Sequence, residues 1–186
     1  MIALPPGRSR QRIGFTDLRL SDLSKLQTWL NRPHLRRFFQ KEPVTLPHVL
    51  AEYGPAIRGE EPSHCHVAWH AGEPFGYLQC YRIAAWPGWA ALIGSDEGTG
   101  VDLAIVEPHM IGRGFGRAML SDYLRDVVFS LFPAENSCFI AHQLENTAAI
   151  ACSRAVGFRY LRNFREDNFE NALYALERDK SDAGRG

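Results

Sequence analysis

The pattern of apolar and polar positions predicts one strand and a helical region at the start of the chain. Residues 13–20 alternate as a half-buried strand does. Ser21 or Asp22 then caps a helix whose apolar residues are spaced for one face, and Pro33 ends that helix. The helical pattern continues in two further pieces, 34–40 and 45–58.

The rest of the chain shows short strand patterns separated by single helices. Two strand patterns on either side of Ala71-Gly72-Glu73 favour a hairpin of 64–70 and 74–83, whereas residues 84–100 are irregular. The remaining predicted elements are strands at 101–106, 138–141, 158–163 and 171–177 and helices at 114–131 and 146–156, the second helix being stopped by Gly157. The order βααβββαβαββ predicts one mixed α/β domain over 13–178, with flexible tails at 1–12 and 179–186.

Composition and charge narrow the class of protein. The 186 residues carry 21 Lys plus Arg and 21 Asp plus Glu, so the formal net charge is zero. Because nucleic-acid proteins usually carry a basic excess, we expect no nucleic-acid partner. No apolar run approaches the roughly 18 residues of a membrane helix, and the basic N-terminus has no apolar core of a signal peptide. We therefore expect a cytoplasmic monomer or homodimer that does not engage a membrane, with its four cysteines reduced.

A glycine-rich stretch is the first feature that indicates chemistry. Gly112, Gly114 and Gly116 alternate with Arg113 and Phe115, directly after an apolar strand and before an amphipathic helix. Glycine lets the backbone turn its N–H groups inward, and a helix N-terminus adds partial positive charge, so the pattern predicts a pyrophosphate site. The spacing is GxGxG rather than the GxGxxG of dinucleotide-binding folds, and the loop lacks the lysine of a P-loop. The alternative is a glycine-rich turn without a ligand.

Two stretches resemble the signatures of the GNAT N-acetyltransferases: VDLAIVEPHMIGRGFGRAML (101–120), which is similar to their acetyl-CoA motif, and NTAAIACSRAVGF (146–158). In the second stretch Asn146, Ala149 and Gly157 fall where the family pattern has them. Three further stretches narrow the resemblance to the aminoglycoside 6'-N-acetyltransferase branch and the related siderophore-biosynthesis acyltransferases: WLNRPHLRRFF (29–39), AEYGPAI (51–57) and GEPFGYLQCY (72–81).

The resemblance implies a fold with two central strands, 101–106 and 138–141, that splay apart to admit acetyl-CoA as co-substrate. The pantetheine arm would pair with the first strand, and the pyrophosphate would take the N–H groups of the glycine loop. Ile111 stands where the family usually has Gln or Arg. The implied cofactor-binding residues are Ala104, Ile105, Ile111, Gly112, Arg113, Gly114, Phe115, Gly116, Arg117, Asn146 and Ala149.

The chemistry requires a neutral amine, because a free primary ammonium has a pKa near about 10 and cannot attack. Asp102 is the candidate base, at the position where the resemblance implies an active-site aspartate, and it could also bind the substrate ammonium. A strand-edge aspartate that faces solvent is the alternative. Ser153 falls where the family usually has the tyrosine that protonates the leaving thiolate, so it is the second candidate catalytic residue.

The acceptor is less well defined than the donor. Tyr53, Trp89 and Asp102 are the candidate substrate contacts, with core packing as the alternative for the two aromatic residues. His142 and Gln143 stand where the aminoglycoside branch tends to have an acidic residue, which counts against a dedicated aminoglycoside enzyme. A metal site made of His64, His66 and His70 is disfavoured against polar residues on a strand face, so we expect no metal.

The sequence therefore predicts a GNAT N-acetyltransferase that passes acetyl from acetyl-CoA directly to a primary amine of a small molecule, similar to the aminoglycoside 6'-N-acetyltransferases. The first alternative is a siderophore-biosynthesis N-acyltransferase with a lysine-derived or hydroxylamine acceptor. A CoA-binding module whose catalysis has lapsed is the alternative from another class. An N-terminal protein acetyltransferase is disfavoured by the resemblance of the N-terminal helices.

Overall fold

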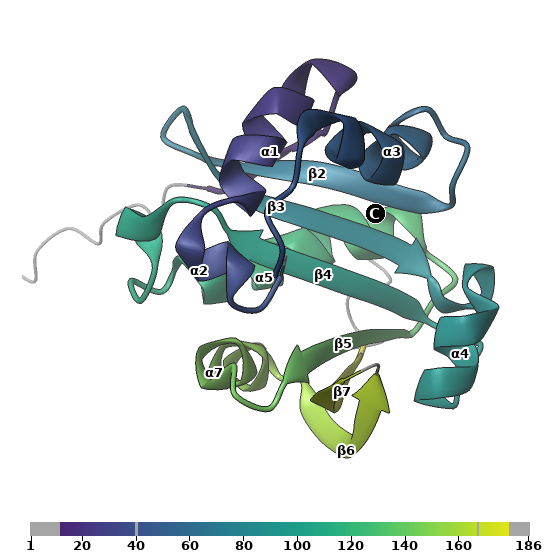
Figure 1. The fold of residues 1–186 in the computed structure, drawn as a ribbon. Helices are drawn as coiled ribbons and strands as arrows, with labels where there is room; N and C mark the ends of the chain where they lie inside the picture. The colour runs from purple at the N-terminus through teal and green to yellow at the C-terminus, as the bar shows by residue number, and fades with distance from the viewer. Residues whose placement is uncertain (1–11, 40, 167, 179–186) are drawn as a thin grey trace, which may run out of the picture.

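A mixed sheet with helices on both faces forms the body of the molecule (Figure 1). The computed structural model describes residues 12–39, 41–166 and 168–178, so the predicted tails 1–12 and 179–186 lie outside the described residues apart from Arg12. Within those residues seven strands occur in the order β1-β2-β3-β4-β5-β7-β6. The strands are β1 (Gly14–Asp17), β2 (Ser63–His70), β3 (Glu73–Arg82), β4 (Thr99–Ile105), β5 (Ser137–Gln143), β6 (Arg159–Glu166) and β7 (Phe169–Glu177).

The helices follow the predicted order with one addition. They are α1 (Leu23–Leu30), α2 (Pro33–Arg36), α3 (Leu46–Ile57), α4 (Pro87–Ile93), α5 (Phe115–Tyr123), α6 (Phe129–Leu131) and α7 (Thr147–Val156). The predicted mixed α/β class is confirmed, as is the hairpin of β2 and β3. Ala71 and Gly72 both have positive φ there, which is the backbone that a two-residue hairpin turn requires.

The two central strands separate as expected. β4 and β5 run parallel and pair only at Thr99–Cys138 and Gly100–Phe139. Figure 1 shows them meeting near α4 and diverging toward α2 and α7. We call this separation beyond residues 100 and 139 the splay. The remaining sheet neighbours are antiparallel, so the splay divides β1–β4 from β5–β7.

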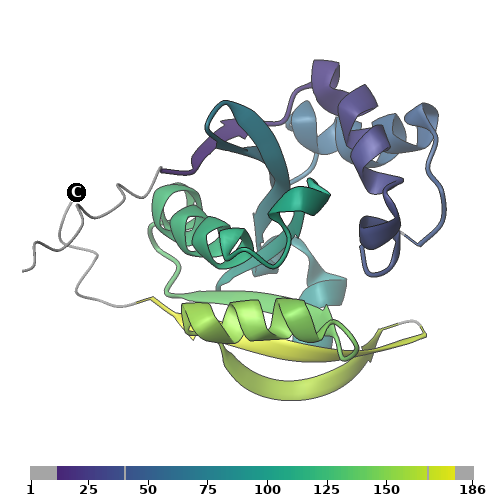
Figure 2. The ribbon, with the colours of Figure 1, turned by 90° about the vertical axis from the view of Figure 1, so that its left-hand side faces the viewer.

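Each face of the sheet has its own core. Val101 and Ile140 pack with Met119 and Leu120 of α5, and Figure 2 shows α5 and α7 on this same side. Tyr77 lies on the other face of the sheet and packs with buried residues of α1 and α3. Side chains of a strand alternate between faces, so neighbours in β4 and β5 belong to different cores.

Several local predictions were wrong. Residues 84–100 contain the helix α4, whose buried Ile93 packs with Ile83. Asp22 does stand at the N-cap of α1, as predicted, but its side chain makes no capping hydrogen bond to that helix: it ends the 3-10 turn Leu20–Asp22, and its carboxylate accepts the Arg19 N–H at 3.0 Å. Pro33 begins α2 rather than ending α1. The predicted single helix 114–131 is interrupted by a π-helical turn, Leu124–Val128.

Candidate active site

Asp102 lies in the middle of β4, opposite Gln79 of β3. Its side chain is half-buried, and its Oδ2 accepts a hydrogen bond from Gln79 Nε2 at 2.9 Å. Tyr81, two residues further along β3, supplies a second side-chain hydrogen bond. The aspartate therefore does not point freely into solvent, which was the alternative interpretation of its place in the sequence.

Burial raises the pKa of Asp102, and the hydrogen bonds from Gln79 and Tyr81 oppose that shift. Among the residues that the structure describes, no lysine, arginine or histidine forms an ion pair with this carboxylate. The site thus holds a half-buried carboxylate with polar donors but without a protein cation. An incoming ammonium group would supply the missing charge.

Ser153 and His142 form a second polar pair. Ser153 lies on α7 and is 1% exposed. Its Oγ lies 2.7 Å from Nε2 of His142, a half-buried residue of β5. Burial lowers the pKa of His142 to about 4, so its imidazole is neutral at pH 7.

The two polar groups occupy opposite faces of the sheet. Asp102 shares a face with Gln79 and with Tyr77, which packs in the core of α1 and α3. His142 lies two residues after Ile140 on β5 and therefore on the same face, the one that packs in the core with α5. A molecule lying in the splay would therefore meet a carboxylate on one side and a neutral imidazole–serine pair on the other.

The glycine loop adopts the conformation that its sequence predicts. Gly112 and Gly114 have φ values of 74° and 85°, the left-handed region that favours glycine, and α5 begins at Phe115. Arg113 and Arg117 are both exposed. A pocket of about 450 Å³ lies against this loop, lined by Ile13, His70, Arg113, Gly114, Phe115, Arg117 and Ala118. Two guanidinium groups at a helix start make this surface suitable for an anion.

Other residues predicted to bind acetyl-CoA contact neighbouring elements of the fold. A Cβ on Gly116 would lie 3.5 Å from both Ile105 of β4 and Cys152 of α7, so the loop sits between these elements. Asn146 caps α7, its Oδ1 accepting the Ala149 N–H at 3.2 Å, which accounts for the spacing of these two residues. Ile111 is 45% exposed.

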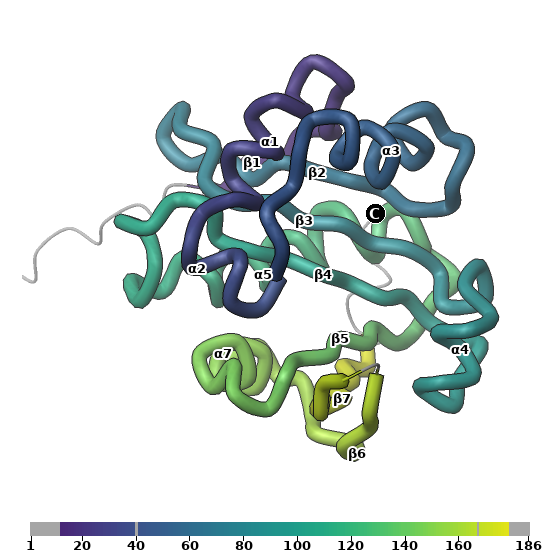
Figure 3. The backbone as a smooth tube through the Cα atoms, in the orientation of Figure 1, coloured from purple at the N-terminus to yellow at the C-terminus, as the bar shows by residue number. Residues whose placement is uncertain are grey.

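The backbone of β4 presents Ile105, rather than Ala104, to the splay. The N–H of Val106 donates to Phe75 O at 2.7 Å, so this N–H and the polar backbone groups of 104 face β3, and those of 105 face the other way. His34 uses that opening, because its Nε2–H donates to Ile105 O at 3.1 Å. Phe38 O, further along the same segment, accepts from Gln143 Nε2 of β5 at 3.5 Å. Residues 34–38, which begin within α2, thus bond to both splayed strands, and Figure 3 shows the backbone of α2 beside β4.

The two aromatic residues predicted to contact the acceptor pack in cores. Tyr53 is 6% exposed and packs edge-on against Tyr77, with ring centroids 5.6 Å apart. Trp89 of α4 is half-buried and packs against Phe164 of β6, with centroids 5.7 Å apart. Its Nε1, like that of Trp86, is buried without a hydrogen-bond partner, so two indole donors remain unsatisfied near the β4–β5 junction. Tyr81 lies between these tryptophans and Asp102, because its ring contacts Trp86 and its hydroxyl contacts Asp102.

Gln79, Tyr81 and His34 were not singled out from the sequence. The available signal was the position of Gln79 as a polar residue within the otherwise apolar strand pattern of 74–83. The partner of that residue is 23 positions away, and the sequence pattern does not specify register over such a distance.

The histidines of β2 do not converge on a metal site. His66 Nδ1 lies 2.8 Å from the Tyr123 hydroxyl, and His70 packs against Phe115. Within the described ranges, the one group of metal-ligating side chains with atoms within 4.8 Å of one another is Glu73, Glu107 and His109. Glu107 is already paired with Arg32 at 2.7 Å.

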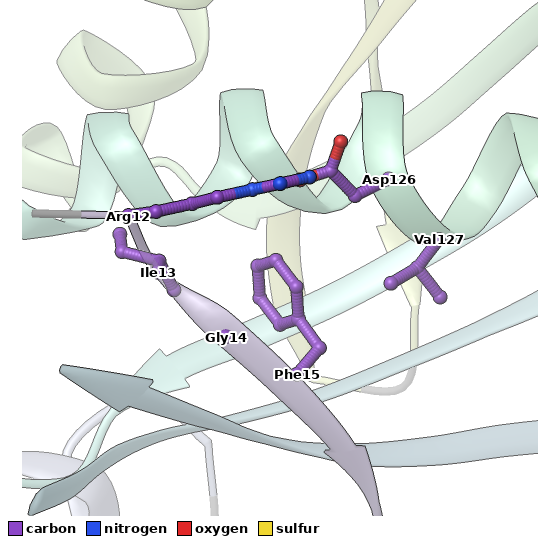
Figure 4. A pocket seen from close by; sticks show the side chains of 6 residues that line it. All are labelled: Arg12, Ile13, Gly14, Phe15, Asp126 and Val127. Atoms are coloured by element: carbon purple, nitrogen blue, oxygen red, sulfur yellow. The ribbon is translucent and has the colours of Figure 1, made fainter. Parts of the chain in front are cut away.

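A separate pocket of about 300 Å³ lies between β1 and the π-helical turn, lined by Arg12, Ile13, Gly14, Phe15, Asp126 and Val127 (Figure 4). Arg12 and Asp126 form an ion pair of 3.2 Å across it. None of the predicted site residues lines this pocket.

No helix in the described parts of the chain has the length and apolar character needed to cross a membrane.

The profile of the family described as "Acetyltransferase (GNAT) domain" matches residues 19–165. Aminoglycoside N(6')-acetyltransferase type 1 of Klebsiella pneumoniae is 29% identical over 142 residues, covering 74% of this chain and 69% of that protein. Lysine N-acyltransferase MbtK of Mycobacterium tuberculosis is 29% identical over 190 residues, covering 95% and 83%. The structure of AAC(6')-Ib in complex with parmomycin and acetyl-CoA is similar in fold, with a TM-score of 0.83, 22% identity and 94% and 98% coverage.

Proposed function

The chain belongs to the GNAT family of acetyltransferases and is an acyltransferase, and from this premise we propose that it transfers acetyl from acetyl-CoA to a primary amine of a small molecule. The amine attacks the thioester directly in a ternary complex, without a covalent enzyme intermediate. The aminoglycoside acetyltransferase and lysine acyltransferase relatives, which act on amines by name, support this class of acceptor.

The half-buried Asp102 carboxylate carries the proposal. It lies beside the splay, accepts hydrogen bonds from Gln79 and Tyr81, and has no cationic partner among the described residues. Such a carboxylate attracts an ammonium group and then accepts its proton, because the raised pKa of Asp102 brings it closer to that of a general base. We assign Asp102 both functions: ammonium binding and proton removal.

The donor side follows the glycine loop. The backbone N–H groups of 112–117 and the side chains of Arg113 and Arg117 would hold the pyrophosphate of acetyl-CoA. The N–H of Ile105, a residue whose carbonyl accepts from His34, would pair with the pantetheine arm. Ala104 contributes to the wall rather than to this pairing, because its backbone faces β3. Asn146 and Ala149 support the site by starting α7.

The incoming ammonium loses two protons in the reaction. Asp102 takes the first, which leaves a neutral amine, and releases it to solvent. The amine nitrogen then forms a bond to the acetyl carbon, the carbon–sulfur bond breaks, and the second proton passes from nitrogen to the CoA thiolate. Ser153 lies on the face opposite Asp102 and supplies a hydrogen bond to the leaving sulfur. Its hydroxyl is available for this when the neutral His142 donates Nε2–H to Ser153 Oγ.

The siderophore-type alternative has one observation in its favour. His142 is neutral and stands on β5, so Asp102 is the one carboxylate we assign to the acceptor side. A polycationic aminoglycoside gains most from several carboxylates, whereas a single lysine-type amine needs only one.

We propose that the protein acts in the cytoplasm as a monomer or homodimer. Its four free thiols suit a reducing compartment.

The test is an acetyl-CoA turnover screen across aminoglycosides, polyamines, lysine derivatives and hydroxylamines. We expect transfer to at least one amine, and a loss of about 10² to 10⁴ in kcat for Asp102→Asn with acetyl-CoA binding retained. The matched control is Asp96→Asn, which changes an exposed aspartate and leaves turnover unchanged. Binding of acetyl-CoA without transfer to any amine would instead favour the module with lapsed catalysis.

A further inference from the structure

A chain of hydrogen bonds runs behind Asp102, away from the splay. Gln79 Nε2 donates to Asp102 Oδ2 at 2.9 Å, and Gln79 Oε1 accepts from the Tyr77 hydroxyl at 2.9 Å. The Tyr77 oxygen also lies 3.4 Å from Cys65 Sγ on β2. Tyr77 is 1% exposed and Cys65 is 8% exposed, so these groups form a buried series from β2 through β3 to β4.

The direction of every bond in this series follows from the charge on Asp102. An ionised carboxylate only accepts, so Gln79 must turn its NH₂ group toward Asp102 and its oxygen toward Tyr77. The hydroxyl of Tyr77 has one proton, which goes to Gln79 Oε1 at 2.9 Å in preference to the more distant Cys65 Sγ at 3.4 Å. All donors point toward Asp102, and bonds aligned in this way polarise one another.

We propose that Gln79 and Tyr77 are positioning residues that keep Asp102 ionised and correctly turned until the substrate ammonium arrives. Gln79 takes one acceptor position on Oδ2, and because a carboxylate has about four such positions, acceptor capacity remains for the substrate beside the bonds from Gln79 and Tyr81. Tyr77 fixes the amide, because a reversed Gln79 would present its oxygen to Asp102 and so favour the protonated carboxyl. This inference rests on the proposed role of Asp102 as base.

The tyrosine and cysteine side chains around Asp102 are neutral at pH 7. They therefore supply no charge that could take over the effect of the Gln79 amide on the pKa of Asp102. Tyr53 of α3 and Cys65 of β2 have pKa values raised by burial, as does Tyr81 of β3. Burial raises the pKa of Cys138 on β5 to about 12. Gln79 and Tyr81 are thus the groups that favour the charged form of Asp102.

The first experiment measures the pKa of Asp102 directly, by ¹³C NMR titration of carboxyl-labelled protein. The signal is assigned through its loss in Asp102→Asn. We expect Gln79→Met to raise this pKa by about one unit or more, because a hydrogen bond to a charged group contributes about 1.5–3 kcal/mol and one pKa unit equals about 1.36 kcal/mol. Gln79→Glu raises it further, because it places a second carboxyl against the first.

Tyr77→Phe tests the orientation of the amide. The ring stays, but Gln79 is free to reverse, so we expect a smaller upward shift than in Gln79→Met. The matched controls are Gln27→Met, which removes an amide that bonds Val44 O on the α1 side, and Tyr160→Phe, which removes an exposed hydroxyl. Both controls should leave the Asp102 pKa unchanged.

An unchanged Asp102 pKa in Gln79→Met overturns the inference, as does a shift equally large in the controls. A merely structural role for Gln79 would lower thermal stability without moving this pKa. The titration needs no turnover, so it remains readable if the acyl-transfer screen fails. Where transfer is found, the acidic limb of the pH profile of kcat/KM should shift upward in the order Tyr77→Phe, Gln79→Met, Gln79→Glu.

Discussion

His142 Nε2 lies 2.7 Å from Ser153 Oγ, which ties β5 to α7 on the face of the sheet opposite Asp102. The imidazole is neutral at pH 7 because burial holds its pKa at about 4. A neutral imidazole and a serine hydroxyl are both poor acids. The pair is therefore suited to hydrogen bonding toward a leaving thiolate and unsuited to protonating it.

Ser153→Ala should for this reason have a modest effect on turnover. We expect kcat to fall by less than about tenfold, since a neutral hydrogen bond contributes about 1 kcal/mol. The fall should be far smaller than in Asp102→Asn, with the KM for acetyl-CoA unchanged. Steady-state kinetics measure both values, with Ser24→Ala on the exposed side of α1 as control. A loss of a hundredfold or more would mean that Ser153 does act as an acid.

The depressed pKa of His142 makes the folded state sensitive to acid. The pKa is about 6.5 in the unfolded chain and about 4 in the folded one, so the unfolded chain binds the extra proton between these values. Stability is therefore fully present above about pH 6.5 and falls as the pH drops toward 4, by up to roughly 3 kcal/mol.

The variant His142→Asn should flatten this dependence. Urea unfolding of wild type and variant at pH 7 and at pH 4.5 gives the comparison, and His48→Asn on the exposed side of α3 should keep the wild-type slope. Equal loss of stability in wild type and His142→Asn on acidification would show that His142 is not the group responsible.

Sequence reasoning reached the elements that have strong periodic or capping signals. The glycine loop, the helix that begins near Asn146 and the hairpin at Ala71-Gly72 each depend on residues close together in the chain. α4 was missed because its seven residues are too few to show a helical period beside Gly88 and Trp89. β6 extends to Glu166 beyond its predicted end because pairing with β7, rather than its own apolar pattern, holds this mostly exposed strand.

For the candidate site as well, residues within local motifs could be predicted from the sequence, whereas their distant partners could not. Asp102 and Ser153 were predicted as site residues because each falls within a recognisable stretch, but their hydrogen-bond partners Gln79 and His142 lie 23 and 11 residues away. Tyr53 belongs to a motif-like stretch and yet is buried, since an aromatic residue on the inner face of a helix packs equally well as core. Contacts across strands depend on register, which a single sequence does not specify.

Gly114 should be more sensitive to alanine than its surface position suggests. Its φ of 85° costs an L-residue about 1–2 kcal/mol, although no atom lies within 4 Å of the added Cβ. We expect Gly114→Ala to weaken acetyl-CoA binding, because the N–H groups of the loop would turn away from the pyrophosphate. Isothermal titration with CoA measures the change. Gly88→Ala, in α4 with an equally open surrounding, should bind CoA as wild type does.

Gly98 precedes the point where β4 and β5 meet, and there alanine should disturb the fold itself. Its φ is 91°, and an added Cβ would lie 3.0 Å from the backbone oxygen of Ser137. We expect Gly98→Ala to lower the free energy of unfolding by more than about 2 kcal/mol, from strain and collision together. Thermal unfolding beside Gly88→Ala tests this, and equal melting temperatures would contradict it.

Residues 34–38, which begin within α2, link the two halves of the sheet. The two halves of the sheet are joined at one end by the short β4–β5 pairing, and at the other end His34 reaches Ile105 while Phe38 reaches Gln143. Residues 34–38 therefore bridge the open end of the splay, so each half of the sheet is held to the other at both ends of the gap between β4 and β5.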